Sequence, residues 1–177
     1  MRVIGGEFRS RRLKSLPGLA TRPTPDRLRE TLFDILGSTI ENKVFLDAYA
    51  GTGAVGIEAL SRGAARAIFI ERRKAIATII SENLASLGST DRAVVVAARA
   101  LSAIARYKAQ IVFLDPPYDL ESEYPQALNI LSQDPPDIVI AQHSVRLALA
   151  EKYGSLQHTR DVRQGDNVLS WYSAKKS

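Results

Sequence analysis

The sequence predicts an α/β fold, doubly wound around a mostly parallel sheet, with an antiparallel hairpin near its C-terminus. Short apolar runs alternate with segments of helical period, which is typical of strand-helix-strand units. The apolar runs are nearly continuous, as in strands that helices cover on both faces. Two further strand-like runs near the C-terminus have no helix between them. With 177 residues, 45% of them hydrophobic, the chain can form one such domain but not two.

Residues 1–37 are expected to form a basic extension that packs on the body of the protein, residues 38–177. The net charge of +5 arises entirely within residues 1–30, which hold eight basic and three acidic side chains. Residues 3–4 and 13–16 flank the basic cluster and predict a small hairpin. A basic arm on a neutral body is typical of polyanion-binding proteins, although solvated N-terminal arginines are a common alternative. The expected polyanion contacts are Arg9, Arg11, Arg12, Lys14 and Arg22.

A helix is predicted at the end of this extension. Thr24 and Pro25 indicate its start, with threonine as the N-cap and proline at the first helical position. Gly37 ends it. The apolar spacing predicts a buried face made of Leu28, Leu32, Ile35 and Leu36.

The body is predicted to contain five parallel strands, at residues 44–46, 67–70, 93–96, 111–114 and 138–141. Three helices are predicted between them, at residues 55–62, 75–87 and 124–131. The closing hairpin is predicted to consist of residues 156–162 and 168–173, joined by residues 163–167. Because the carboxyl ends of parallel strands share one edge of a sheet, a ligand is expected at that edge.

Composition excludes several classes of function. The chain has no cysteine, so it has neither a disulfide framework nor a thiolate metal site. His143 and His158 lie far apart without ligand-like spacing, and no metal is expected. No apolar stretch is long enough to cross a bilayer, and the first residues lack a signal-peptide core. We therefore expect a cytoplasmic protein without membrane contact.

Asp115, Pro116, Pro117 and Tyr118 directly follow the predicted strand at residues 111–114. Neither proline has a backbone N–H, so the strand stops and carbonyl oxygens are left available. Asp115 and the Pro116 carbonyl can both accept hydrogen bonds from an exocyclic amine, while Tyr118 stacks on the ring. The stretch resembles the Asp-Pro-Pro-Tyr signature of methyltransferases that act on exocyclic amino nitrogens of nucleobases. A proline-rich turn with a carboxylate near a helix start is the alternative.

A glycine turn joins the first predicted strand to its helix. Gly51 to Gly56 has the spacing G-x-G-x-x-G, and Glu71 follows at the interval of a ribose-binding acid, which makes a nicotinamide-dependent oxidoreductase one candidate. Asp47 lies directly before the turn, however, where a carboxylate repels a pyrophosphate. It suits the α-ammonium of S-adenosylmethionine, and the pattern of Asp47, Gly51 and Gly53 resembles the first motif of class I methyltransferases. Helix capping or ion pairing is the alternative role for Asp47 and Glu71.

Taken together, the sequence resembles the bacterial family that methylates the N2 amine of a guanine in the 16S ribosomal RNA of the small subunit. The resemblance runs nearly end to end, through residues 2–6, 21–33, 46–56, 69–71, 83–84, 115–118 and 164–166. It implies a Rossmann-like class I methyltransferase fold, S-adenosylmethionine as the cofactor, and ribosomal RNA or the assembling small subunit as the partner. The basic residues of the arm then become RNA contacts. The implied cofactor-binding residues are Thr24, Asp47, Tyr49, Gly51, Gly53, Glu71, Arg72, Arg99 and Ala100.

The resemblance also implies that Arg22 and Thr24 close over the methionine end of the cofactor and the target nucleotide, unless they only form a charged helix-capping loop. One position departs from the pattern of such families, which usually place an Asp or Asn after the third strand to accept from the adenine amine. Arg99 has donors only. We expect backbone groups to hold the adenine and Arg99 to turn outward.

Three other interpretations stay open at this point. The first is a DNA adenine-N6 or other amine methyltransferase, against which the lack of a separate sequence-reading domain argues. The second is the NAD-dependent oxidoreductase, and the third is a non-catalytic RNA-binding module. No interface helix is left unassigned, which favours a monomer.

Overall fold

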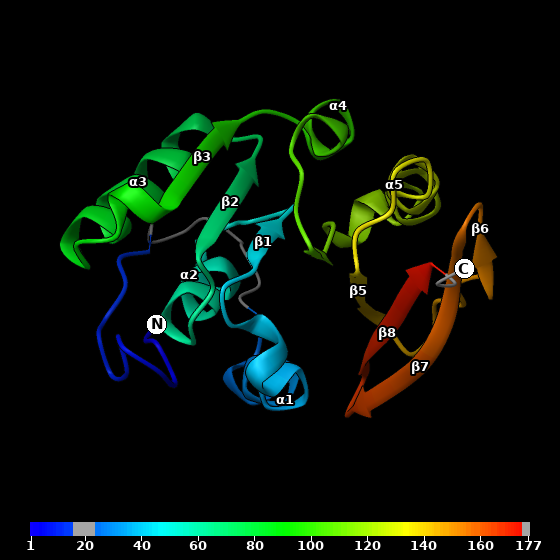
Figure 1. Cartoon of the computed structure of the whole chain (residues 1–177), viewed down its shortest axis with the longest axis horizontal. Coiled ribbons are helices and arrows are strands. Elements are labelled where there is room, and N and C mark those ends of the chain that lie inside the picture. Colours follow the sequence, from blue (N-terminus) through cyan, green and yellow to red (C-terminus); the bar gives the residue numbers. More distant parts are fainter. Residues whose placement is uncertain (16–23, 175–177) are drawn as a thin grey trace.

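Within residues 1–15 and 24–174, which this computed structural model describes, the chain forms an eight-stranded sheet (Figure 1). The strand order is β3-β2-β1-β4-β5-β8-β7-β6. The first five strands in the sequence are parallel, and β8, β7 and β6 continue the sheet in antiparallel pairs. The strand bounds are β1 Val44–Asp47, β2 Arg66–Glu71, β3 Ala93–Ala97, β4 Ile111–Leu114, β5 Ile138–Ser144, β6 Lys152–Tyr153, β7 Leu156–Gln164 and β8 Asn167–Ala174.

Helices cover both faces of the sheet, with α1, α2 and α3 on one side and α4 and α5 on the other. The α-helices are α1 Asp26–Leu36, α2 Ala54–Ser61, α3 Lys74–Ser86, α4 Ala100–Ala103 and α5 Glu123–Leu131. Short 3-10 turns are η1 Gly37–Ile40, η2 Thr90–Arg92, η3 Ile104–Arg106 and η4 Tyr118–Leu120. Among the described helices, none is long and apolar enough to cross a membrane.

Side chains that alternate along the strands supply both cores. In β4 and β5, Phe113 and Ile140 pack with α1 and α2, whereas Leu114 and Ala141 pack with α4 and α5. All four are almost completely buried. The continuous apolar runs are therefore explained by burial on two faces, and the predicted fold class is confirmed.

The start of α1 differs from the prediction. Pro25, rather than Thr24, occupies the N-cap position, and no described side chain caps the helix there. Thr24 instead directs its hydroxyl toward Asp115 Oδ2, at 3.4 Å. Gly37 does end the helix, with a φ of 49°. The buried face of α1 comprises Leu28, Arg29, Leu32, Phe33 and Leu36, while Ile35 is only half-buried.

The two predicted hairpins also differ in extent. Among the described residues of the N-terminal segment, the pairing is a bridge between Arg2 and Arg12; residue 16 lies outside the described residues. At the other hairpin, β7 and β8 pair up to a tight turn at Gly165 and Asp166. The sequence did not predict β6 or α4, because a few residues are too short to show a period.

Candidate active site

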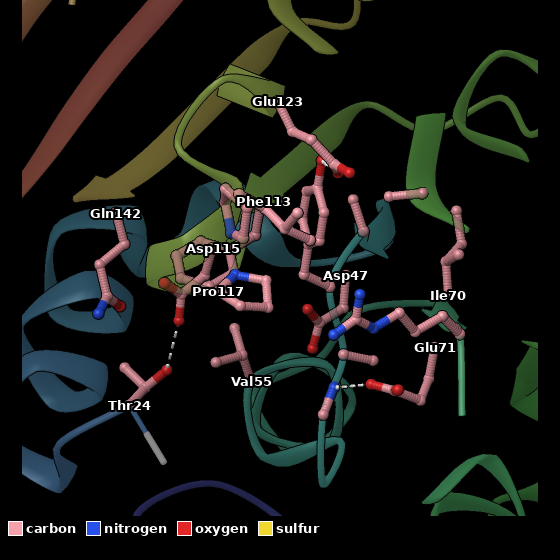
Figure 2. A pocket seen from close by; sticks show the side chains of 18 of the residues that line it. Thr24, Asp47, Val55, Ile70, Glu71, Phe113, Asp115, Pro117, Glu123 and Gln142 are labelled. Carbon is pink, nitrogen blue, oxygen red and sulfur yellow. Dashed lines mark hydrogen bonds between the residues drawn. The ribbon is translucent and has the colours of Figure 1, made fainter. Parts of the chain in front are cut away.

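A pocket of about 520 Å³ opens at the carboxyl ends of the parallel strands (Figure 2). Pockets of this size hold small molecules in other proteins. The loops that follow β1, β2, β3 and β4 contribute to its wall, together with the end of β5 and the residue that precedes the N-cap of α1. The predicted site residues that line it are Thr24, Asp47, Tyr49, Gly51, Glu71, Arg72, Arg99, Ala100, Asp115, Pro116, Pro117 and Tyr118.

Two glycines shape the turn between β1 and α2. Gly53 is the N-cap of α2 in a left-handed conformation, with a φ of 82°, and a Cβ there would lie 3.2 Å from Ile80. Three residues later, a Cβ on Gly56 would lie 2.3 Å from the ring of Phe69. Glycine is therefore required for α2 to approach β2 this closely. Gly53 does not line the pocket itself, but sets the turn that does.

Asp47 is the last residue of β1 and is 1% exposed. Its Oδ2 accepts a hydrogen bond from the N–H of Gly56, at 3.0 Å, in the first turn of α2. Burial raises the pKa of Asp47 to about 7; the Gly56 N–H opposes this shift, and the carboxylates of Asp115 and Glu71 reinforce it. Asp47 thus caps α2, and a cationic group placed beside it would favour its ionised form.

Glu71 ends β2 and braces the glycine turn. Its Oε2 accepts the N–H of Gly51 at 3.0 Å. Its Oε1 accepts the N–H of Arg73 at 2.9 Å and the Nε–H of the same residue at 3.1 Å. The expected alternative of an ion pair is therefore present, and the arginine involved is Arg73, which the sequence did not single out. Arg72 is exposed at the pocket, and a ribose contact at Glu71 stays a prediction.

The end of β3 forms another part of the rim. Arg99 is exposed and is the N-cap residue of α4, whereas Ala100 behind it is buried. The N–H of Ala98 donates to the carbonyl of Glu71 at 3.2 Å, which joins this loop to β2. How the adenine is held here stays a prediction.

Asp115 follows β4 and lies across the pocket from Glu71 (Figure 2). The Thr24 hydroxyl donates to Asp115 Oδ2 at 3.4 Å, drawn as a dashed line in Figure 2. Thr24 is 8% exposed. Thr24, which precedes the N-cap of α1, is thus joined to the loop after β4 at the pocket. The capping role expected from the sequence would not have made this connection.

The two prolines differ in what their carbonyls do. The Pro117 carbonyl accepts the N–H of Leu120 at 2.8 Å and so closes η4. This corrects the expectation that both proline carbonyls stay available. Within the described part of the chain, no hydrogen bond reaches the Pro116 carbonyl, which lies at the pocket. Tyr118 is 56% exposed, which is unusual for so large a ring.

The wall beneath α5 is held by two tyrosine hydroxyls. The Tyr49 hydroxyl donates to Glu123 Oε2 at 2.7 Å, and the Tyr124 hydroxyl donates to the backbone carbonyl of Gln142. Burial raises the pKa of both phenols above the ordinary value, so both stay donors. These bonds fix α5 against the loop after β1 and against β5.

Sequence reasoning missed the pocket residues at the end of β5. Gln142, His143 and Ser144 line the pocket, with Asn167 beside them on β8. His143 Nε2 lies 2.7 Å from Ser170 Oγ, so this ring is held in place. The sequence did contain a signal for these residues. Polar residues directly follow the apolar run of β5, as Asp115 follows that of β4.

Four of the five predicted RNA-binding residues lie elsewhere. Arg9 and Arg12 are exposed, Arg11 Nη2 donates to the Ser86 carbonyl, and Lys14 pairs with Glu82. None of these four cations lines the pocket. Arg22 lies outside the described residues.

The acidic lining fits the expected S-adenosylmethionine better than a dinucleotide. Asp47, Glu71 and Asp115 all face the pocket. A buried carboxyl with a pKa near 7 would repel a pyrophosphate once ionised, whereas an α-ammonium would stabilise that ionised form. Gly51 and Gly53 have positive φ, which favours glycine, and the lack of a side chain there lets a ligand approach the backbone of the turn closely.

Comparisons with known proteins identify the family to which the chain is similar. The family model described as "Conserved hypothetical protein 95" matches residues 1–173. The chain is 38% identical over 185 residues to "Putative rRNA methyltransferase YlbH" of Bacillus subtilis (strain 168), covering 99% of this chain and 100% of that protein. It is 44% identical over 120 residues to "Ribosomal RNA small subunit methyltransferase D" of Escherichia coli (strain K12), covering 67% of this chain and 60% of that protein.

Solved structures show the same architecture. "Putative methyltransferase yhhF" from Escherichia coli superposes with a TM-score of 0.86 at 32% identity, over 100% of this chain and 99% of that one. An RNA methyltransferase from Salinibacter ruber, solved in complex with S-adenosyl-L-homocysteine, has a TM-score of 0.68 at 17% identity, over 88% of this chain and 95% of that one. The second likeness is one of fold.

Proposed function

The chain belongs to the family described as conserved hypothetical protein 95, and from that premise we propose that it methylates the exocyclic N2 amine of a guanine in small-subunit ribosomal RNA. It is a methyltransferase, and S-adenosylmethionine is its cofactor. The names of its relatives support an rRNA substrate. The observation that carries the choice of an amine is that Asp115 and the Pro116 carbonyl share one pocket with Asp47.

The chemistry of Asp115 and Pro116 follows from the weakness of the nucleophile. An aromatic exocyclic amine reacts poorly because its lone pair is delocalised into the ring. Two acceptors, the Asp115 carboxylate and the Pro116 carbonyl, can take the two amine hydrogens and localise that pair on nitrogen. As positive charge develops on nitrogen, the carboxylate stabilises it. The Thr24 hydroxyl orients the carboxylate at 3.4 Å. When bound, S-adenosylmethionine supplies the methyl group on an electrophilic sulfonium.

Tyr118 is the residue proposed to hold the target base. A base inside a helix is out of reach of a pocket, so enzymes that modify bases act on an unstacked nucleotide. The exposed ring of Tyr118, which begins η4 directly after the two prolines, offers a surface on which that base can stack. Positioning of the amine then supplies much of the rate enhancement.

The test of this proposal is the isosteric variant Asp115→Asn. It keeps the shape of the side chain but removes the charge that opposes the developing cation. We expect the methylation rate constant kcat to fall by about 10²- to 10³-fold, while the affinity for S-adenosylhomocysteine stays that of the wild type. Asp134→Asn is the matched control, because this exposed carboxylate does not line the pocket. An equal loss of cofactor binding would assign Asp115 to the cofactor instead.

Labelled methyl transfer to different acceptors separates the remaining alternatives. Small ribosomal subunits from a strain that lacks its own methyltransferase of this kind, protein-free small-subunit RNA, and DNA are compared, and the product nucleoside is identified by mass spectrometry. We expect N2-methylguanosine in the subunit or its RNA. Methyladenine in DNA would establish the DNA alternative and overturn the proposal.

A further inference from the structure

Gln142 has a buried side-chain oxygen, Oε1, without a partner among the described residues. The residue is 7% exposed and lines the pocket. No described residue donates a hydrogen bond to its Oε1. Its backbone is well fixed, since its carbonyl accepts the Tyr124 hydroxyl and it pairs with Leu169 of β8. Buried polar atoms in native proteins nearly always have partners, so this amide on a pocket wall points to a ligand.

The strand register brings Gln142 and Asp115 to the same edge of the sheet. β4 and β5 pair in parallel with Phe113 opposite Ile140, and Asp115 and Gln142 each lie two residues further along. Neighbouring strands are about 4.8 Å apart, and side chains two residues apart share a face. The two polar side chains therefore continue the row of Phe113 and Ile140 at the edge of the sheet. Figure 2 shows Gln142, Asp115 and Thr24 on the same side of the pocket.

The neighbouring carboxylate and carboxamide complement one edge of guanine. When the N2 amine of guanine lies on Asp115, the next group along that edge is the N1–H donor, followed by the O6 acceptor. A glutamine offers an acceptor, Oε1, and a donor, Nε2. An adenine with its N6 amine on Asp115 would instead present the N1 acceptor. A cytosine with its N4 amine there would present two acceptors, N3 and O2.

We propose that Gln142 selects guanine, with Oε1 accepting a hydrogen bond from N1–H and Nε2 donating one to O6. This inference rests on the proposed function, because it takes Asp115 as the place where the amine is held. Asp115 alone accepts hydrogen bonds from any exocyclic amine. Gln142 supplies the second contact, which distinguishes the base, and its buried oxygen gains a donor that the described residues do not provide.

Two variants at this position test the assignment on small ribosomal subunits. Gln142→Leu keeps the size and removes both polar groups, whereas Gln142→Glu keeps the shape and places a second acceptor opposite O6. We expect both to lower kcat/KM for methylation, the leucine variant by about 10- to 100-fold. The melting temperature and the affinity for S-adenosylhomocysteine should stay at the wild-type level. Gln126→Leu on the exposed face of α5 is the matched control and should methylate as the wild type does.

A base analogue distinguishes the loss of guanine recognition by Gln142 from a general misplacement of the target base. The guanine that the wild type methylates is first mapped, and subunits are then reconstituted with 2-aminopurine at that position. This analogue keeps the amine but lacks N1–H and O6. The wild-type enzyme should prefer guanine over it by about 10- to 100-fold, and Gln142→Leu should show no preference.

The possible failures are distinguishable. A leucine variant that methylates guanine at the wild-type rate, or that keeps the preference over 2-aminopurine, overturns the role of Gln142. A wild-type enzyme that forms no N2-methylguanosine overturns the proposed function itself, whatever the variants do.

Discussion

Asp47 is a carboxyl group whose protonation is controlled by the fold. Burial raises its pKa to about 7, so the folded protein binds this proton more tightly than an unfolded chain does. Its contribution to stability is therefore full below the ordinary pKa of an aspartate and is lost as the pH rises through about 7. A cationic group in the pocket opposes that loss, because it favours the carboxylate.

We predict that S-adenosylhomocysteine, which carries the same α-ammonium as the cofactor, binds more tightly as the pH rises. Below pH 7, ligand binding must release the proton of Asp47, so the Kd should fall by roughly tenfold per pH unit and level off above pH 7. Asp47→Asn should give a flat profile. Calorimetric titrations in two buffers of different ionisation enthalpy measure the released proton. Equal proton release by the wild type and the variant would assign the titration to another group.

Tyr118 is a second single residue whose role can be tested. Because its ring is exposed, an effect on binding can be distinguished from an effect on folding. We predict that Tyr118→Ala weakens the interaction with the target nucleotide by about 1–3 kcal/mol, the usual worth of stacking a base on an aromatic ring. Tyr118→Phe should retain most activity. Since the ring is 56% exposed, urea unfolding of both variants should match the wild type. A phenylalanine variant as impaired as the alanine variant would show that the hydroxyl matters instead.

Among the structural elements, α2 anchors the beginning of the N-terminal segment, residues 1–15. Glu58 of α2 is completely buried and accepts the N–H groups of Ile4 at 2.9 Å and Gly5 at 2.8 Å. It also pairs with Arg62 Nε at 2.9 Å and with Arg29 Nε at 3.6 Å. One carboxylate thus joins the N-terminal segment, α1 and α2, directly behind the glycine turn.

We predict that Glu58→Ala destabilises the fold by about 3–5 kcal/mol, because it leaves the buried guanidinium of Arg29 without its buried counterion. The exposed Asp26 pairs with the same guanidinium, and screening by solvent limits what it can replace. Urea unfolding measures the change. Glu82→Ala removes an exposed pair with Lys14 and should cost no more than about 1 kcal/mol. Equal losses in the two variants would contradict the anchoring role.

The five parallel strands and the main helices of the body could be predicted from the sequence, because the spacing of apolar residues within each segment indicates its secondary structure. Contacts between elements could not. Arg29 looked like one more cation of the basic arm, because nothing in the sequence shows that Glu58 will lie beside it. Thr24 has the local pattern of an N-cap, but the fold brings Asp115 to its hydroxyl. The position of Gln142 follows from strand register, whereas the lack of a partner for its Oε1 among the described residues depends on packing.

At the scale of the whole molecule, two exposed arginines of the N-terminal segment and the pocket occupy different places. Arg9 and Arg12 are exposed and do not line the pocket. Within the described residues, neither forms an ion pair, unlike Lys14. Figure 1 shows the N-terminal segment beside α2 and α3, on the opposite side of the molecule from β6 and β7. The proposed long-range attraction of RNA and the proposed recognition of one base can therefore be tested separately.

We predict that the double variant Arg9→Ala, Arg12→Ala weakens RNA binding without changing the chemical step. Each lost phosphate contact should reduce the slope of log K against log salt by about one unit, and KM should rise while kcat at saturating RNA stays unchanged. Asp115→Asn should do the reverse, lowering kcat at an unchanged salt slope. Lys152→Ala, on the far edge strand β6, controls for net charge. If that single change lowers the slope as much per charge as the double variant does, the RNA senses the overall charge of the protein rather than a surface formed by the N-terminal segment.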